Sequence, residues 1–376
     1  MKKITHIITG LNVGGAEMML YKVLQHSHGK EFQHEVISLT DVGLIGEKIQ
    51  KLGVGVRALH MRGLDLPIVV LRLALWLRKS NPDIVQTWMY HADLVGGLAT
   101  KLGFLHTPII WGIRQSNLHP KLSKLRTRFV TRLSAFLSRW VPTKILCNSN
   151  SGKETHIRMG YDEKKMLVIP NGFDVLRFHQ DEEARISVRK ELEISPVAFI
   201  IGYIARFDPQ KDHGTFIEAA RILNTSSTDV HFVLCGRGVS WSNKELVLWI
   251  EKVNLRNNFH LLDEREDIPR ITAALDVASL TSAYGEGSPN TVGEAMACGV
   301  PCVVTDVGDS AYIVGNTGFV APLGDRVALA NSLRQMIEMK DDKRKALGQR
   351  ARRRIEENFS IGLVVKKYTE LYTSLA

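Results

Sequence analysis

Two glutamates in the second half of the chain, Glu286 and Glu294, flank a segment that predicts the start of a helix. Between them, Ser288 and Pro289 stand in the order of an N-cap residue followed by a proline in the first helical turn. The backbone amides of residues 290–292 would then point out of the helix N-terminus, where they favour a phosphate. Carboxylates on either side of that phosphate can accept hydrogen bonds from sugar hydroxyls. These groups together fit the sugar and the diphosphate of a nucleotide sugar.

Two cations follow an apolar run in the same half of the chain. Residues 199–205 predict a buried strand, Arg206 stands at its carboxyl end, and Lys211 follows across a short proline turn. Ligands of open α/β sheets bind at this end of the strands. Two positive charges there can neutralise a leaving diphosphate, whereas the plain structural alternative is a salt bridge at the end of the strand.

A glycine-rich turn, ending in Gly14 and Gly15, follows the first apolar run. Glycines let backbone amides approach a ligand closely. The spacing from Gly10 does not match the dinucleotide-binding fingerprint G-x-G-x-x-G. Taken alone, the turn is equally consistent with a phosphate contact and with a tight turn that binds nothing.

These segments resemble the signatures of family 4 of the retaining glycosyltransferases. The stretch 286–294, with its Glu-Ala-Met-Ala and Gly-x-Pro continuation, is similar to the E-x7-E motif, and 206–211 matches the Arg-x4-Lys pair. The resemblance implies that Glu286 contacts the donor sugar, that Glu294 binds the ribose, and that the glycine turn reaches the donor diphosphate. The turn after 259–262 resembles the base-recognition turn, although Asp263 stands where glycine is frequent. The implied donor-side residues are Gly14, Gly15, Glu286, Gly287, Ser288, Pro289, Asn290, Thr291, Val292, Glu294 and Arg265.

The resemblance places the acceptor site in the first half, where segments 88–93 and 111–117 follow apolar runs. His91 and Arg114 match positions that relatives often fill with acceptor-site or phosphate-facing residues. His119 is a rival to His91. A single histidine at the start of a helix is also commonly structural, so both roles for His91 stay open.

The implied reaction moves a sugar from a nucleoside diphosphate sugar to an acceptor hydroxyl with retention of configuration, by front-face substitution. The predicted catalytic residues are Arg206, Lys211, Glu286 and His91. No D-x-D element is present, so we expect neither a metal ion nor another cofactor. The resemblance favours a glycan or polyprenyl-diphosphate-linked acceptor in the assembly of bacterial capsule, exopolysaccharide or lipopolysaccharide.

The elements that must position these residues form two series of short apolar runs separated by amphipathic helical patterns. The runs are 4–8, 35–39, 84–86, 109–111, 145–147 and 167–169, then 199–205, 232–235, 259–262, 277–280, 302–305 and 318–320. This alternation predicts an α/β protein of two doubly wound Rossmann-like domains. The resemblance implies the GT-B fold, in which the domains face a central cleft and a C-terminal helix crosses back to the N-terminal domain. We expect an acceptor domain at 1–172 plus 360–376 and a donor domain at 173–359.

Composition narrows the remaining possibilities. At 376 residues two domains are the default, and the formal charge of +10 favours anionic partners. The four cysteines are scattered without zinc-site spacing, which indicates reduced thiols and a cytoplasmic protein. Residues 66–77 are too few to span a bilayer.

A basic amphipathic helix is predicted at 121–140, with two interpretations. Its apolar stripe either packs in the core or attaches the protein peripherally to the anionic inner face of the plasma membrane. Two rivals to a glycosyltransferase are a nucleotide-sugar 2-epimerase of GT-B-like fold and a basic nucleic-acid-binding protein. Since no nucleic-acid motif is present, we expect no nucleic acid partner.

Overall fold

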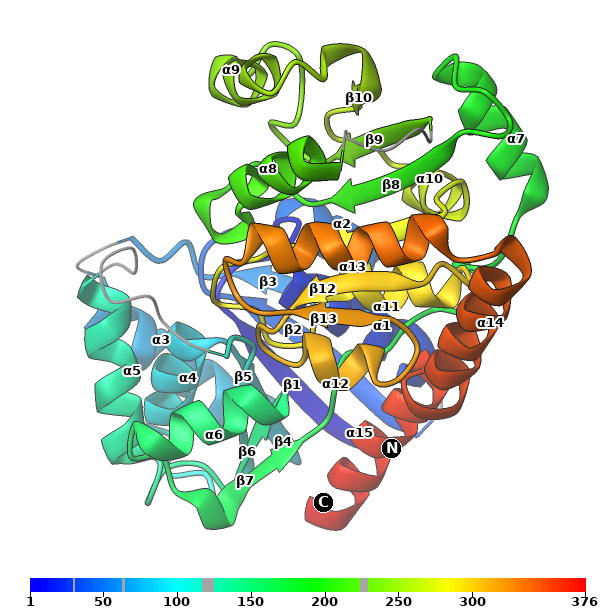
Figure 1. Ribbon diagram of the computed structural model, residues 1–376. Helices are drawn as coiled ribbons and strands as arrows, with labels where there is room; N and C mark the ends of the chain where they lie inside the picture. Colours follow the sequence, from blue (N-terminus) through cyan, green and yellow to red (C-terminus); the bar gives the residue numbers. More distant parts are fainter. Residues whose placement is uncertain (30, 63–64, 117–124, 224–228) are drawn as a thin grey trace. The chain divides into compact units, whose positions relative to one another are not determined.

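The computed structural model describes residues 1–29, 31–62, 65–116, 125–223 and 229–376. It divides into two compact units: unit 1 is Met1–Gly172 with Ile361–Ala376, and unit 2 is Phe173–Ser360. Each unit is built on a parallel sheet covered by helices (Figure 1). The chain passes twice between the units, and Phe173, at the start of unit 2, forms a parallel bridge with Ser360 at its end.

Unit 1 has a sheet of order β3-β2-β1-β4-β5-β6-β7. Its described strands are β1 (Lys2–Ile8), β2 (Phe32–Ser38), β3 (Gly55–Ala58), β4 (Ile84–Trp88), β5 (Ile109–Ile113), β6 (Lys144–Cys147) and β7 (Met166–Val168). Its described helices are α1 (Gly15–Ser27), α2 (Gly43–Gln50), α3 (Leu66–Ser80), α4 (Tyr90–Leu102), α5 (Leu125–Leu137), α6 (Asn150–Arg158), the 3-10 turn η1 (Glu163–Lys165) and α15 (Ile361–Leu375).

The predicted runs of the first half are all strands, with ends shifted by a few residues. Only β3 was missed. It is an edge strand of four residues in which exposed and half-buried side chains alternate, so it lacks the continuous apolar character of strands buried on both faces.

Unit 2 has a sheet of order β10-β9-β8-β11-β12-β13. Its described strands are β8 (Phe199–Ile204), β9 (Val230–Cys235), β10 (Phe259–Leu261), β11 (Val277–Leu280), β12 (Cys302–Thr305) and β13 (Phe319–Ala321). Its described helices are α7 (Glu182–Glu191), α8 (His213–Leu223), α9 (Lys244–Lys252), α10 (Ile268–Ala273), α11 (Asn290–Ala297), α12 (Ser310–Val314), α13 (Arg326–Glu338) and α14 (Asp341–Asn358), with 3-10 turns η2 (Pro209–Lys211) and η3 (Arg256–Asn258).

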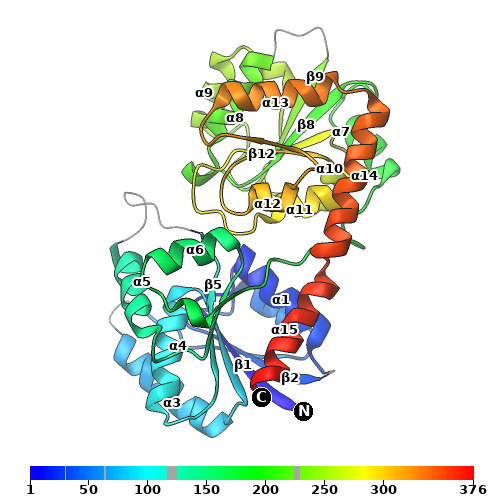
Figure 2. The same ribbon diagram turned by 60° about the horizontal axis from the view of Figure 1, so that its bottom comes forward.

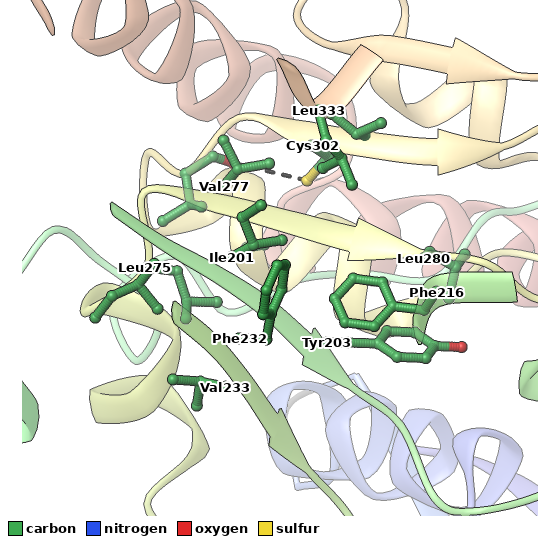
Figure 3. Close-up of a cluster of buried hydrophobic side chains, with 14 of the residues drawn as sticks. Ile201, Tyr203, Phe216, Phe232, Val233, Leu275, Val277, Leu280, Cys302 and Leu333 are labelled. Carbon is green, nitrogen blue, oxygen red and sulfur yellow. Dashed lines mark hydrogen bonds between the residues drawn. The ribbon is translucent and has the colours of Figure 1, made fainter. Parts of the chain in front are cut away.

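The core of unit 2 fills the space between the sheet and the helices on its faces (Figure 3). Tyr203 of β8 lies against Phe216 of α8 with ring centroids 5.1 Å apart, and Phe216 meets Phe232 of β9 edge-to-face at 5.9 Å. Such aromatic pairs add to the stabilisation from apolar burial. This packing places β8 between α8 and β9 in the core of unit 2.

The direction of chain progression reverses once in each sheet. In unit 1 the reversal falls between β1 and β4, and in unit 2 between β8 and β11. Ligands of doubly wound sheets bind outside the carboxyl ends of the strands at such a reversal. The loops after β1 and β4, and those after β8 and β11, are the segments that the sequence singled out.

The C-terminal helix α15 packs on α1 and β1 within unit 1 (Figure 2). Its Tyr368 stacks on Trp88 of β4, with ring centroids 6.2 Å apart and an interplanar angle of 12°. Tyr372 donates a hydrogen bond to buried Gln86 of the same strand. A C-terminal helix that belongs to the N-terminal unit is what the resemblance implied.

Helix α5 differs from its core-packing interpretation. Its largest apolar side chains, which we call the α5 apolar face, are mainly exposed: Leu125 by 78%, Phe129 by 68%, Phe136 by 62%, and Trp140 just beyond the helix by 59%. The residues that the helix buries are small, namely Thr131, Ser134 and Ala135. The core-packing interpretation therefore holds only in part: Leu137 is partly buried against a hydrophobic core of unit 1, whereas the larger side chains of the α5 apolar face are exposed. Residues 121–124 of the predicted helix lie outside the described residues.

Candidate functional site

The loop after β8 is shaped by its own aspartates. Asp208 accepts a hydrogen bond from the amide of Gln210 at 2.9 Å and so caps the 3-10 turn η2. Asp212 ends that turn in the left-handed conformation, with φ of 50°. Arg206 donates to Asp208 at 3.2 Å and to Gln210 at 3.3 Å, and its side chain is 45% exposed. This arginine is therefore oriented at the sheet edge but open to solvent.

Lys211 and Glu286 form a buried ion pair across the reversal point between β8 and β11. Ser282 donates a second hydrogen bond, of 2.7 Å, to the Oε1 atom of Glu286 that Lys211 contacts. The backbone carbonyl of Lys211 is held by Tyr203 and by the Thr281 hydroxyl at 3.1 Å. The structure thus brings together two residues that lie 75 positions apart and were predicted to act on one ligand.

Helix α11 begins one residue later than predicted. Its N-cap is Pro289, in an extended conformation with ψ of 118°, and no side chain caps the helix. Ser288 is therefore not the N-cap, and Pro289 is not in the first helical turn. The first amides of an α-helix still lack intrahelical acceptors, so the start of α11 keeps its suitability for a phosphate. Glu286 precedes it, and Glu294 lies in its second turn, half-buried.

The loop before α11 is fixed by close packing of backbone groups, and the sequence analysis did not predict this packing. Gly308 has φ of 60°, and a Cβ atom there would lie 2.3 Å from the carbonyl oxygen of Glu286. The amide of Asp309 donates to the carbonyl of Gly287 at 2.9 Å. A Cβ atom on Gly293 would lie 2.2 Å from the ring of Phe173. Gly293, the residue before Glu294, therefore lets α11 pack on the first residue of unit 2.

The predicted donor contact Arg265 lies in an ion network. Its guanidinium donates twice to Asp267 and once to Glu191, each at 2.8 Å, and Arg270 shares both carboxylates. Hydrogen bonds from Arg265 lower the pKa of Asp267 to about 2. Asp263 has φ of 53°, which explains why glycine suits its position. Neither the donor role of Arg265 nor a base contact follows from this geometry, and both stay predictions.

In unit 1, the glycine turn leads directly into α1. Gly14 is its N-cap, with no side-chain cap, and Gly15 is its first residue. Burial raises the pKa of Glu17 in the first turn, and the charge of Arg114 partly opposes this. Arg114 follows β5 and is held by three contacts: it donates to Asn171 at 2.6 Å and to Tyr368 at 3.3 Å, and lies 5.1 Å from the Trp88 ring centroid.

His91 takes a different position at the same sheet edge. It is the second residue of α4, and the N-cap of that helix, Met89, has a positive φ of 74°. Burial, and next the charge of Arg126, lowers the pKa of His91, which favours the neutral imidazole. Its side chain lines an apolar cavity between α4 and α5. His119, its rival, lies outside the described residues.

Two family models match the chain. The model described as Glycosyltransferase Family 4 matches residues 13–177, and the one described as Glycosyl transferases group 1 matches residues 185–354. The chain belongs to glycosyltransferase family 4. As a family 4 member it is a glycosyltransferase, as its motifs predicted. The first model spans most of unit 1 and the second most of unit 2.

Relatives of this family 4 chain include two bacterial glycosyltransferases that match most of its length. It is 29% identical over 309 residues to the UDP-Gal:alpha-D-GlcNAc-diphosphoundecaprenol alpha-1,3-galactosyltransferase of Escherichia coli, covering 80% of this chain and 77% of that one. It is 26% identical over 342 residues to the lipopolysaccharide core biosynthesis mannosyltransferase LpsB of Rhizobium meliloti, covering 88% and 90%.

The fold of this glycosyltransferase is shared by solved structures. Anabaena Alr3699/HepE in complex with UDP matches with a TM-score of 0.87 at 22% identity, over 100% of both chains. The lipopolysaccharide outer core galactosyltransferase WaaB in its apo form matches with a TM-score of 0.74 at 16% identity. The predicted GT-B fold of two Rossmann-like domains is thereby confirmed.

Proposed function

We propose that this glycosyltransferase moves a hexose from a UDP-hexose to a hydroxyl of a sugar linked through diphosphate to a polyprenyl lipid, in the assembly of a bacterial surface polysaccharide. The observation that carries the proposal is the pairing of Lys211 with Glu286 beside the start of α11, at the reversal point of unit 2. The Escherichia coli relative, whose name states a UDP-Gal donor and a diphosphoundecaprenol-linked acceptor, supports the choice of substrates.

The chemistry follows from the charges of this site. The bond between the anomeric carbon and the diphosphate oxygen breaks while the acceptor hydroxyl attacks, and its proton passes to the leaving phosphate. Arg206 and the amides of α11 would stabilise the negative charge that develops on that phosphate. Lys211 joins them once Glu286 turns from the lysine to the sugar hydroxyls. Retention by front-face attack, and independence from metal ions, are part of this proposal.

The test is a transfer assay with a panel of UDP-, GDP- and TDP-sugars and a synthetic sugar diphosphate carrying a prenyl chain. We expect product from one UDP-hexose, with unchanged rate in EDTA and an anomeric configuration equal to that of the donor by NMR. An epimerised free nucleotide sugar formed without acceptor would identify an epimerase instead. Transfer from GDP-sugars alone would refute the UDP-hexose donor. A product of inverted configuration would refute retention, and loss of activity in EDTA would refute independence from metal ions.

Variants for this test must leave the fold intact. Lys211→Ala would leave the buried Glu286 carboxylate without its cation, at a cost of about 3–5 kcal/mol. Arg206→Ala and Glu294→Gln are better, because the first side chain is half-exposed and the second change preserves shape. We expect each to weaken UDP binding about tenfold or more in calorimetry. If both variants bound UDP with the affinity of the wild type, the assignment of these residues to the donor site would be wrong.

Attachment to an anionic membrane is a further part of the proposal, supported by the α5 apolar face. This face exposes three aromatic rings, those of Phe129, Phe136 and Trp140, beside Arg132 and Arg139, which are exposed as well. Such a combination suits the interface of a bilayer that contains acidic lipids. Among the described residues no helix is long and apolar enough to cross a membrane, so contact would be made from the surface.

Vesicle flotation tests this attachment. The protein should float with vesicles of phosphatidylglycerol and phosphatidylcholine, and much less with phosphatidylcholine alone. Phe136→Asn with Trp140→Asn should reduce flotation, whereas Ile186→Asn should not, although Ile186 on α7 of unit 2 is 61% exposed. Equal flotation of both variants, or of both vesicle types, would contradict the membrane contact at α5.

A further inference from the structure

An apolar groove in unit 1 runs from the catalytic edge of the sheet along α4. It has a volume of about 750 Å³ and is bounded by α4, by the first turns of α5, and by Met61 and the first residue of α3. Figures 1 and 2 show these three helices together on one side of the unit 1 sheet. Its apolar walls include Met61, Leu66, Leu94, Val95, Phe129 and Leu133. We call this feature the α4 groove.

One end of the α4 groove lies where chemistry is expected. Thr9 directly follows β1 and His91 opens α4, so both stand at the carboxyl edge of the sheet, beside its reversal point. Leu94 and Val95 follow His91 by three and four residues and therefore continue the same helix face away from that edge. Arg126 of α5 also lines the groove, and its charge reaches His91. The groove is thus polar and cationic at the edge and apolar beyond it.

The side chains that wall the groove show that it suits an apolar occupant. Phe129 is 68% exposed and Leu125 78% exposed, although both line it. Exposed apolar side chains gathered around a hollow mark a binding site more often than an ordinary surface. A volume of this size is typical of pockets for small molecules. A glycan or a peptide would leave its hydrogen-bonding groups unsatisfied against these walls.

We infer that the α4 groove binds the isoprenoid chain of the lipid acceptor, in the part next to its diphosphate. The inference rests on the proposed function, which supplies a lipid diphosphate as acceptor. An apolar chain matches the walls, and the diphosphate matches Arg126 at the edge, so the two ends of the groove complement the two ends of one ligand. The anchored sugar would then be presented beside His91 at the sheet edge.

Binding measurements without donor or sugar test the groove independently of catalysis. Farnesyl diphosphate and methyl diphosphate carry the same head group, and calorimetry on the full chain compares their affinities. We expect farnesyl diphosphate to bind at least about tenfold more tightly, because burying even two methylene groups contributes that much. Equal affinities in the wild type would overturn the inference.

Two phenylalanines on α5 provide a matched pair of variants. Phe129 lines the groove, whereas Phe136, also exposed, packs against Trp140 with ring centroids 5.0 Å apart. Phe129→Asn should reduce the advantage of farnesyl over methyl diphosphate about tenfold, and Phe136→Asn should leave it unchanged. An equal loss in both variants would mean that the whole apolar face adsorbs amphiphiles, and would overturn the groove. Both side chains are exposed, so neither change threatens folding.

Labelling and transfer separate the remaining outcomes. A photoreactive farnesyl diphosphate should label peptides from α4 and the start of α5, and labelling only elsewhere would refute the groove. If the isoprenoid chain binds in the α4 groove but no sugar is transferred from a nucleotide sugar to any prenyl-linked acceptor, the proposed function fails and the inference about the groove stands. If methyl- and farnesyl-linked acceptors are glycosylated with equal kcat/KM, the function stands and the groove fails.

Discussion

A buried pair of histidines beneath α15 should make unit 1 sensitive to acid. His34 of β2 lies 2.9 Å from the ring nitrogen of His6 on β1 and 3.0 Å from the Ser27 hydroxyl. Burial, with a smaller effect of His28, lowers the pKa of His34 to about 3. Burial also lowers the pKa of His6, with a contribution from His34. Both rings are therefore neutral in the folded protein.

The sign and size of the effect follow from linkage. An unfolded histidine titrates near pH 6.5, so below that pH the unfolded chain binds a proton that folded His34 refuses. The free energy of unfolding therefore falls by about 1.4 kcal/mol per pH unit, or about 2 kcal/mol between pH 7.5 and pH 5. The stabilising contribution is fully present above pH 6.5 and is lost as pH falls towards 3.

The perturbation is His34→Gln, which keeps hydrogen-bonding groups but cannot titrate. At pH 7.5 the variant should be less stable, by about 1–3 kcal/mol, because a buried and hydrogen-bonded ring is lost. At pH 5 that gap should shrink by about 2 kcal/mol. The difference between the two proteins reports His34 together with its smaller effect on the pKa of His6, since the remaining titrating groups contribute to both.

The assay must report on unit 1 alone, because a chain of two compact units is not expected to unfold in one step. Native-state hydrogen exchange of peptides from β1 and β2, measured by mass spectrometry at both pH values and corrected for intrinsic rates, does this. A gap that stays constant between pH 7.5 and pH 5 would show that His34 binds its proton in the folded state. The burial reasoning would then be wrong.

Three further outcomes are expected. Burial raises the pKa of Asp93 to about 8, so the free energy of unfolding of unit 1 falls as pH rises from 4 to 8; by hydrogen exchange of unit 1 peptides, Asp93→Asn should remove about 3 kcal/mol of that loss between pH 5 and 7. Gly293→Ala should lower Tm by several degrees through overlap with Phe173, whereas Gly362→Ala, whose Cβ would meet nothing within 4 Å, should not. Ser282→Ala removes the 2.7 Å hydrogen bond to the site carboxylate and should lower kcat/KM for the donor about tenfold.

The ion pairs of the donor site affect how variants of its residues change nucleotide binding. Each cation of the Arg-x4-Lys pair has a carboxylate partner in this structure: Arg206 has Asp208, and Lys211 has Glu286. A diphosphate must compete with these partners. Removing a carboxylate can therefore tighten nucleotide binding while slowing sugar transfer, so affinity and kcat have to be measured separately.

The sequence by itself determined the elements of the donor site. Arg206, Lys211 and Glu286 each follow an apolar run, and runs buried on both faces of a parallel sheet are legible without a structure. Glycine, proline and carboxylate at fixed spacing around the start of a helix describe local geometry, which depends on neighbours in the chain. The edge strand β3 is short and half-exposed, so it has no continuous apolar run and was not predicted.

Only the tertiary structure decided which groups meet and which faces stay open. Ser282 and Gly308 support Glu286 through contacts set by packing of β11, β12 and their loops, which no local pattern encodes. The stripe of α5 has the periodicity of a core helix, yet the structure fully buries small residues and leaves most of the large apolar side chains exposed. Periodicity states that a helix has an apolar side, whereas the shape of the surface beneath it decides which side is buried.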